Sequence, residues 1–238
     1  MPMLAGERML GSVHLENHER DNAYGPDDIR LLETVASGMA VALLNAKSYE
    51  AERQRSAELA VINAVQKALA GELDLQAVYN AVGDKLSEVF DGFGVVIRRY
   101  DAPTNLMHFP YFLGPDGREE VSARPPGGLG AEVLRTRQTL LINENTAEHA
   151  IRLGAVVISK SGNLPKSQLI VPLLVGGEVH GMIDLLDRQR EHGFTDANVR
   201  LLETIAGSMA TALENARLFD ETQRLSREST ALDRKSVV

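Results

Sequence analysis

Histidine and cysteine, the residues that most often bind metals or act as nucleophiles, are sparse in this 238-residue chain. Cysteine is absent, which excludes thiolate metal sites, cysteine nucleophiles, disulfides and any cofactor attached through a thioether. The six histidines form no HExxH run. His14 and His18 are four residues apart, but we expect them at a strand end and in a loop rather than on one helix face. The sequence therefore predicts no metal site.

Phosphate-binding and nucleophile motifs are missing as well. The chain has no GxxxxGK[ST] loop and no GxSxG elbow. Gly128-Leu129-Gly130 is too short for a dinucleotide fingerprint and follows an expected loop, so a turn into a helix explains it better. No catalytic residue is predicted, and we expect a protein that is not an enzyme.

Composition and charge argue against nucleic acids and membranes as partners. The net charge is −8, aromatic residues make up 5% and tryptophan is absent, which disfavours a basic or base-stacking surface for nucleic acids. Apolar runs such as 169–175 are far shorter than the ~20 residues that span a bilayer. No basic start followed by an apolar core marks a secretion signal. We expect a cytoplasmic protein with no membrane span and no nucleic-acid partner.

An internal repeat organises the chain. Residues 2–47 (the first copy) align without a gap with residues 172–217 (the second copy), and 18 of the 46 aligned positions are identical. A spacing of 170 residues is too long for a solenoid unit, so the repeat indicates two copies of a whole domain. Only the last part of the first domain is present, and we expect either a gene that begins inside a domain or a piece of a longer protein.

Periodicity predicts the elements that position any site. Alternating apolar residues predict strands, and apolar residues at steps of three and four predict helices. Strands are expected over 2–5, 9–16, 92–100, 105–113, 139–142, 169–175 and 179–186, and helices over 28–70, 74–90, 131–136 and from 196 onward, with some helix in 143–166. This order predicts an α+β fold with a mostly antiparallel sheet.

Single residues refine these elements. Asp74 is a candidate N-cap, and Gly176-Gly177 suits a tight hairpin. Pro110 inside a strand indicates an edge or a bulge. Gly181 lies within a strand and repeats Gly11, which indicates close approach of a helix or a neighbouring backbone.

The long helices predict self-association. Leu218, Leu225 and Leu232 are seven residues apart, which is a thin heptad stripe on the outgoing helix. A solvated helix tail is the alternative interpretation. We expect a homodimer through a coiled coil. The residues predicted to pair the helices are Met209, Leu213, Ala216 and Leu225.

The second copy resembles the GAF family of small-molecule-sensing modules. SQLIVPLLVGGEVHGMIDLL over 167–186 is similar to the family's strand, Pro-Leu, hairpin and strand. GFTDANVRLLETIAGSMATALENARLF over 193–219 is similar to its Phe-Thr helix start and its Ala-Leu-x-Asn-Ala signature. Weaker similarity extends upstream through Gly128-Leu129-Gly130, Val133-Leu134 and 139–142.

The resemblance implies a six-stranded antiparallel sheet flanked by helices. The first and last helices would pack on one face, and a ligand pocket would lie on the other, covered by residues 143–166. The implied organisation is a C-terminal remnant of a first module over 1–47, a connecting helix over 48–56, a complete module over 57–218 and an outgoing helix over 219–238.

Few of the residues that bind cofactors in this family are present in this chain. Bilin attachment and methionine sulfoxide reduction in the family use cysteines, which this chain lacks. Of the cyclic-nucleotide pattern, only Phe194 matches well in the second copy, and a Phe there is also common core packing. Haem through His149 competes with a solvated histidine next to a polar run. The cofactor therefore stays unknown.

Five residues fall on elements that the resemblance places near the pocket. They are polar or amphipathic and could contact a small ligand, although each also fits a surface role. The candidate ligand-binding residues are Arg98, Tyr111, Asn143, His149 and Arg152. An empty, structural pocket is the alternative.

The resemblance implies a sensory and signal-relay module that binds a small molecule or mediates dimerisation, as in two-component systems. Its output domain would lie elsewhere in a longer chain. One alternative is a fragment of a signalling enzyme (a histidine kinase, nucleotide cyclase or phosphodiesterase) whose catalytic domain is absent. The other is a purely structural dimerisation module.

Overall fold

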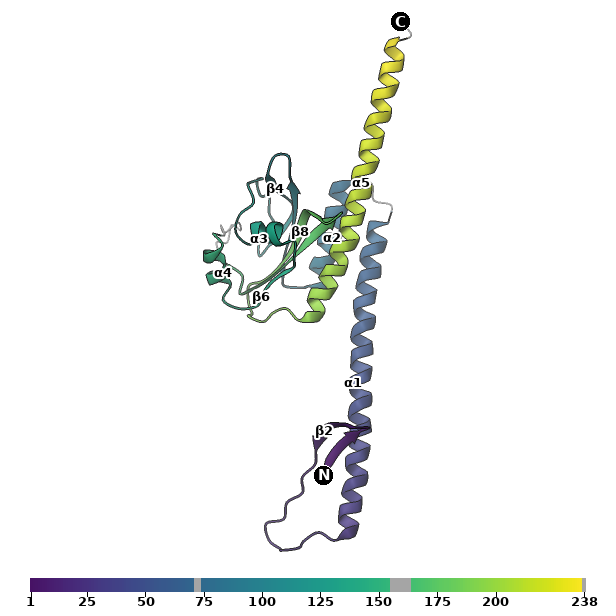
Figure 1. The fold of residues 1–238 in the computed structure, drawn as a ribbon, viewed down its shortest axis with the longest axis vertical. Coiled ribbons are helices and arrows are strands. Elements are labelled where there is room, and N and C mark those ends of the chain that lie inside the picture. The colour runs from purple at the N-terminus through teal and green to yellow at the C-terminus, as the bar shows by residue number, and fades with distance from the viewer. Residues whose placement is uncertain (71–73, 155–163, 237–238) are drawn as a thin grey trace. The chain divides into compact units, whose positions relative to one another are not determined.

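The computed structural model describes residues 1–70, 74–154 and 164–236, with the side chains of the last helix described up to Arg224 (Figure 1). The chain divides into two compact units, Met1–Ala60 and Val61–Val238. Helix α1 (Pro26–Leu69) runs through the division. The four-part organisation expected from the resemblance stays a prediction.

The second unit is built on a six-stranded sheet in the order β5-β4-β3-β8-β7-β6, in which every neighbouring pair is antiparallel. This confirms the α+β class and the six-stranded antiparallel sheet. The elements in chain order are α2 (Leu75–Val89), β3 (Gly94–Asp101), β4 (Leu106–Gly114), β5 (Gly117–Arg118), α3 (Gly128–Thr136), β6 (Leu140–Ile142), α4 (Thr146–Arg152), β7 (Ser167–Val175), β8 (Glu178–Asp187) and α5 (Asp196–Ser236).

Side-chain alternation gives the sheet two faces. One face packs against α2, α5 and the end of α1 in the main core, to which β8 contributes Ile183 and Leu185. The opposite face carries a smaller cluster that includes Ile170 and Met182 and packs against α3. Figure 1 shows α3 and α4 on one side of the strands and α2 and α5 on the other. We call the second face the α3 face.

Local signals account for the element ends. Asp74 caps α2, because its side chain accepts a hydrogen bond of 2.9 Å from the amide of Ala77. Gly176 and Gly177 both have positive φ, as a tight hairpin between β7 and β8 requires. The register of β3 against β4 shifts between Ile97 and Arg99, so of the two alternatives that Pro110 indicates, an edge or a bulge, the structure shows a bulge.

The first unit holds a two-stranded sheet of β1 (Pro2–Ala5) and β2 (Arg8–Ser12) and the first part of α1. The first part of α1 is similar in sequence to the first part of α5, but its side chains are less buried. Val35 is 44% exposed, whereas its repeat counterpart Ile205 is fully buried. Met39 is 48% exposed, whereas its counterpart Met209 is fully buried. These apolar side chains therefore lack the sheet that covers their counterparts.

This repeat also explains a finding that departs from the sequence expectation. Among the described residues, α1 is long and apolar enough to span a membrane by length and composition alone, with an 18-residue window of mean hydropathy 1.3. Uninterrupted apolar runs, from which the sequence predicts no membrane span, are short in α1. The repeated positions face a buried core in α5, which accounts for this hydropathy without a bilayer.

The predicted dimer helix needs a correction. Met209 and Ala216 have no exposed surface, and Met209 belongs to the same buried cluster as Val65 of α1. A helix of a partner chain therefore cannot reach these two residues. Leu213 is half-buried against the same cluster, and Leu225 lies outside the residues whose side chains are described. Dimerisation itself stays a prediction.

The close approach at Gly181 gives a matched pair of substitutions. A Cβ on Gly181 would lie 2.2 Å from the carbonyl oxygen of Arg98 in β3. Gly181→Ala should therefore lower the unfolding free energy by about 1–3 kcal/mol. Gly207→Ala in α5 meets nothing within 4 Å and should raise it by about 0.5–1 kcal/mol. Urea denaturation measures both, and equal stability of the two variants would contradict the close approach.

Tyr79 of α2 should make the fold sensitive to alkali. Burial raises its pKa to about 12, and the charge of Arg99 opposes the rise. The neutral phenol is favoured in the folded state, so its contribution is complete below pH ~10 and is lost as pH rises toward about 12. The loss should be on the order of 2 kcal/mol in wild type and absent in Tyr79→Phe. Unfolding free energies of both proteins, measured by denaturation across this pH range, test the prediction. The same pH dependence in wild type and Tyr79→Phe would refute it.

Candidate functional site

A buried polar cluster lies at the centre of the α3 face. Arg98 of β3 forms an ion pair with Asp184 of β8, and Gln168 of β7 donates a hydrogen bond of 3.3 Å to the same carboxylate oxygen, Oδ2. Asp184 is fully buried, Gln168 is 6% exposed and Arg98 is 8% exposed. Three adjacent strands therefore each contribute one polar side chain to one point of the sheet.

Two atoms of this cluster are unsatisfied. Asp184 Oδ1 and Arg98 Nε are buried and have no hydrogen-bond partner among the residues that the structure describes. Burial raises the pKa of Asp184, and the guanidinium of Arg98 opposes the rise. A buried acceptor and donor without partners are costly, so they mark a place where a further polar group would be stabilised.

Apolar side chains surround the cluster. They come from strands β4, β6, β7 and β8 and from helix α3, and they give the site a water-poor wall. The buried members are Met107, Leu129, Val133, Ile142, Ile170 and Met182.

The first turn of α3 lies directly against the cluster. A Cβ on Gly130 would lie 2.6 Å from Nη1 of Arg98, so a side chain at this position would require the guanidinium to shift. The N-cap is Gly127, which has no side chain to cap the helix, and no acidic residue stands in the first turn. The structure shows no side-chain acceptor for the first amides of this helix at its N-cap.

Further arginines gather on the same face. The guanidinium carbons of Arg98 and Arg124 lie 5.9 and 5.6 Å from the centroid of the Phe109 ring. Arg188 follows β8, and its Nη1 would lie 2.9 Å from a Cβ on Gly94 at the start of β3. Burial lowers the pKa of Arg188, and Glu119 and Asp116 oppose that change.

Of the five predicted ligand residues, the structure places only Arg98 in the buried cluster. Tyr111 is on the opposite face of the sheet, where its hydroxyl donates a hydrogen bond of 3.0 Å to Asp84 of α2. Its predicted place at the pocket is therefore wrong for this conformation, because the bulge in β4 turns it toward α2. Arg118 lies 3.7 Å over the Tyr111 ring and completes this structural contact.

The other three predicted residues lie around α4. The side chain of Asn143 donates to the carbonyl of Phe194 at 2.8 Å and accepts from its amide at 3.2 Å, so it braces a loop. His149 and Arg152 are 2.8 Å apart on α4, and Arg152 is exposed. Within the described residues, none of the three forms a hydrogen bond with Arg98 or Asp184.

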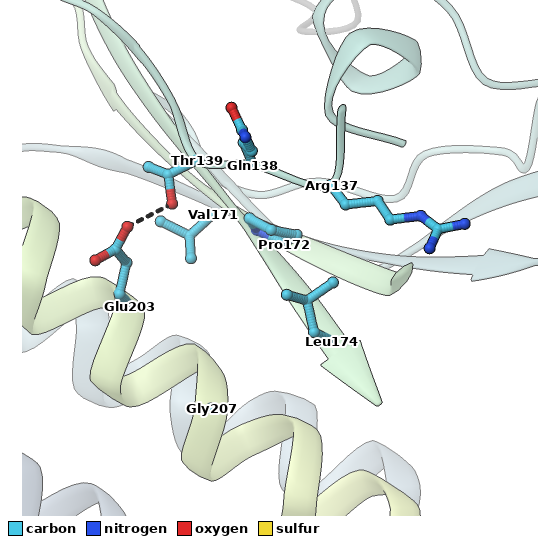
Figure 2. Close-up of a pocket in the computed structure, with 8 residues that line it drawn as sticks. All are labelled: Arg137, Gln138, Thr139, Val171, Pro172, Leu174, Glu203 and Gly207. Atoms are coloured by element: carbon cyan, nitrogen blue, oxygen red, sulfur yellow. Dashed lines mark hydrogen bonds between the residues drawn. The ribbon is translucent and has the colours of Figure 1, made fainter. Parts of the chain in front are cut away.

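Two open pockets lie away from the cluster. One of about 540 Å³ lies between the edge of β7 and helix α5, and Figure 2 shows Thr139 donating a hydrogen bond to Glu203 across it at 2.6 Å. Another of about 600 Å³ lies between α2, α5 and the β7–β8 hairpin, with Tyr79 and Arg99 in its wall. Neither contains the buried Arg98–Asp184 pair. The cluster is the candidate site because two of its buried polar atoms have no hydrogen-bond partner.

Asp184 and Gln168 are the residues that sequence reasoning missed. Asp184 stands inside the apolar run Met182-Ile183-Asp184-Leu185-Leu186. A charge in such a run is a signal for a buried polar role, because apolar residues on both faces of the strand indicate that both faces are buried. Gln168 carries no comparable signal, since polar residues at strand starts are common.

Comparison with known proteins matches the chain to one family. The family model described as "GAF domain" matches residues 72–214. Two formate hydrogenlyase transcriptional activators, from Salmonella typhimurium (strain LT2) and Escherichia coli (strain K12), are 23% and 22% identical over 236 residues. These matches cover 94% of this chain and 34% of each relative, so the chain spans about a third of their length.

Solved structures agree on the fold. The GAF domain from an Acinetobacter phosphoenolpyruvate-protein phosphotransferase matches with a TM-score of 0.57 and 15% identity, over 67% of this chain and 94% of that one. A free methionine-R-sulfoxide reductase from Neisseria meningitidis, in complex with its substrate, matches with a TM-score of 0.55 and 20% identity, over 66% and 89%. At these identities the likeness shows the fold alone.

The ion pair should behave as a coupled unit. Arg98→Met leaves Asp184 buried without its cation and should lower the unfolding free energy by about 3–5 kcal/mol. The double variant Arg98→Met/Asp184→Leu removes both charges and should recover most of that loss. Denaturant unfolding of both single variants and the double variant completes the cycle. Additive losses would show that the two side chains are not coupled.

Proposed function

The chain belongs to the GAF domain family, and from this premise we propose that it is a sensory module that binds a small molecule on the α3 face and relays the signal through α5. The observation that carries the proposal is the Arg98–Asp184–Gln168 cluster, which leaves a buried donor and a buried acceptor unsatisfied within an apolar wall. Polar groups placed in an apolar pocket are typical of small-molecule sites.

The sheet supplies a route from this site to the outgoing helix. Asp184 faces α3, whereas its neighbours Ile183 and Leu185 face the main core. In that core they belong to the same cluster as Leu202 and Ile205 of α5. A ligand that binds one position of Asp184 better than another would therefore shift the packing under α5, and small shifts of packed helices pass signals between domains.

We propose that the signal acts on an output domain that lies outside these 238 residues. The relatives carry the name of transcriptional activators, which favours a transcriptional output over the two-component output that the resemblance suggests. A catalytic domain of a signalling enzyme elsewhere in the protein remains the second candidate. We propose no sulfoxide reductase activity for the module, because in the family resemblance that chemistry uses cysteines and this chain has none.

A cytoplasmic homodimer fits this proposal. The buried positions Met209 and Ala216 leave the exposed surface beyond them for pairing, where Leu218 is 46% and Phe219 is 41% exposed. Two copies joined along α5 would convert a shift in one module into a change between two helices. A purely structural dimer is the remaining alternative, and it requires no ligand.

Native mass spectrometry of the purified chain tests the function. We expect a small molecule that remains bound under native conditions and is released on denaturation, or one that is captured from a metabolite extract. The variant Arg98→Met/Asp184→Leu, which is expected to fold, should lose it. Failure of wild type to retain or capture any molecule would overturn the sensory function and favour the structural dimer. Equal binding by the double variant would overturn the assignment of the site.

A further inference from the structure

The cavity of about 600 Å³ lies on the helical side of the sheet, between α2, α5 and the β7–β8 hairpin, and we call it the helix-side cavity. Its volume falls within the range of about 300–1,000 Å³ that is typical of small-molecule sites. Most of its wall is apolar, as such sites require. The apolar side chains of the wall include Leu75, Leu173, Val175, Val179, Ala210 and Leu213.

Arg99 brings a positive charge to this cavity. It follows Arg98 directly in β3, so the two side chains leave the sheet on opposite faces. Ile97, two positions before Arg99, belongs to the main core on the helical side. Within the described residues Arg99 forms no ion pair. Its charge acts on Tyr79 in the same wall, where it opposes the rise in pKa that burial causes.

The other charged side chains in the wall have partners. The three carboxylates accept from a neighbouring donor, and these pairs are Asp101 with Thr104 at 2.6 Å, Glu178 with Arg137 at 3.1 Å and Glu214 with Arg217 at 2.8 Å. His180 also lines the cavity, and its charge when protonated acts on Glu214. Of the two guanidinium groups in the wall, Arg99 is therefore the one without a carboxylate.

We propose that the helix-side cavity is a second ligand site, which takes a small amphiphile with an apolar body and one anionic head, held by Arg99 and Tyr79. This inference goes beyond the proposed function and does not rest on it. An anionic head accepts charge-assisted hydrogen bonds from a guanidinium and a hydrogen bond from a phenol. The apolar body removes the surface of the wall from water. The bound molecule would contact α5 directly at Ala210 and Leu213.

Two probes of equal chain length separate the head from the body. Isothermal titration of the full chain uses sodium octanoate and uncharged 1-octanol, both below the concentrations at which they aggregate. We expect wild type to bind octanoate about tenfold more tightly than octanol. Arg99→Gln should weaken octanoate binding by about tenfold and leave octanol binding unchanged. Arg200→Gln is the matched control, because this exposed arginine of α5 lies outside the cavity wall and should bind both probes like wild type.

Two further variants locate the site. Leu213→Trp enlarges a half-buried side chain of the wall and should weaken the binding of both probes. Arg98→Met/Asp184→Leu changes the α3 face alone and should bind octanoate like wild type. Circular dichroism and thermal unfolding of each variant verify that the fold is retained.

Three results would overturn the proposal. They are no binding of either probe to wild type, equal octanoate affinity of wild type and Arg99→Gln, and loss of octanoate binding in Arg98→Met/Asp184→Leu. Octanoate binding that appears only when a dimer is diluted to monomers would show that another molecule of this protein covers the cavity, which also overturns it. Failure of the sensory function would appear separately, as no molecule retained or captured in native mass spectrometry.

Discussion

The alternation of side chains along β8 is the constraint on which both the main core and the polar cluster of the α3 face depend. Successive residues of a strand face opposite sides, so Ile183 and Leu185 must enter the helical core when Asp184 enters the α3 face. The six-stranded sheet is thin, with one layer of backbone between the main core and the polar cluster. A change at the polar cluster therefore has a short path to the helices.

The same alternation explains what sequence reasoning can and cannot reach. The long helices, the β7–β8 hairpin and the cap of α2 follow from local residues such as Asp74 and Gly177, whose effects do not need distant partners. The faces of β4 do not follow in this way. Met107 and Tyr111 are four residues apart and would share a face in a regular strand, but the bulge between them places them on opposite faces.

The candidate site was reachable only in part for a related reason. Arg98 is recognisable as a charged residue in a strand, but its partner Asp184 is 86 residues away and belongs to a strand that pairs with it only in the folded sheet. The closeness of the α3 turn to Arg98 depends on how the helix packs on the folded sheet, which no spacing along the chain records. Burial is likewise tertiary, since Val35 and Ile205 have similar surroundings in sequence and opposite exposure.

Asn143 lies between β6 and α4, and its side chain holds Phe194 by two hydrogen bonds just before α5 begins. The carbonyl of Asn143 also accepts a hydrogen bond of 2.6 Å from the amide of His192. Asn143 is thus joined to the loop before the outgoing helix by three hydrogen bonds that do not involve the sheet. The start of α5 is therefore connected to the α3 side of the module by two separate routes, the hydrogen bonds of Asn143 and the packing of Ile183 and Leu185 against that helix.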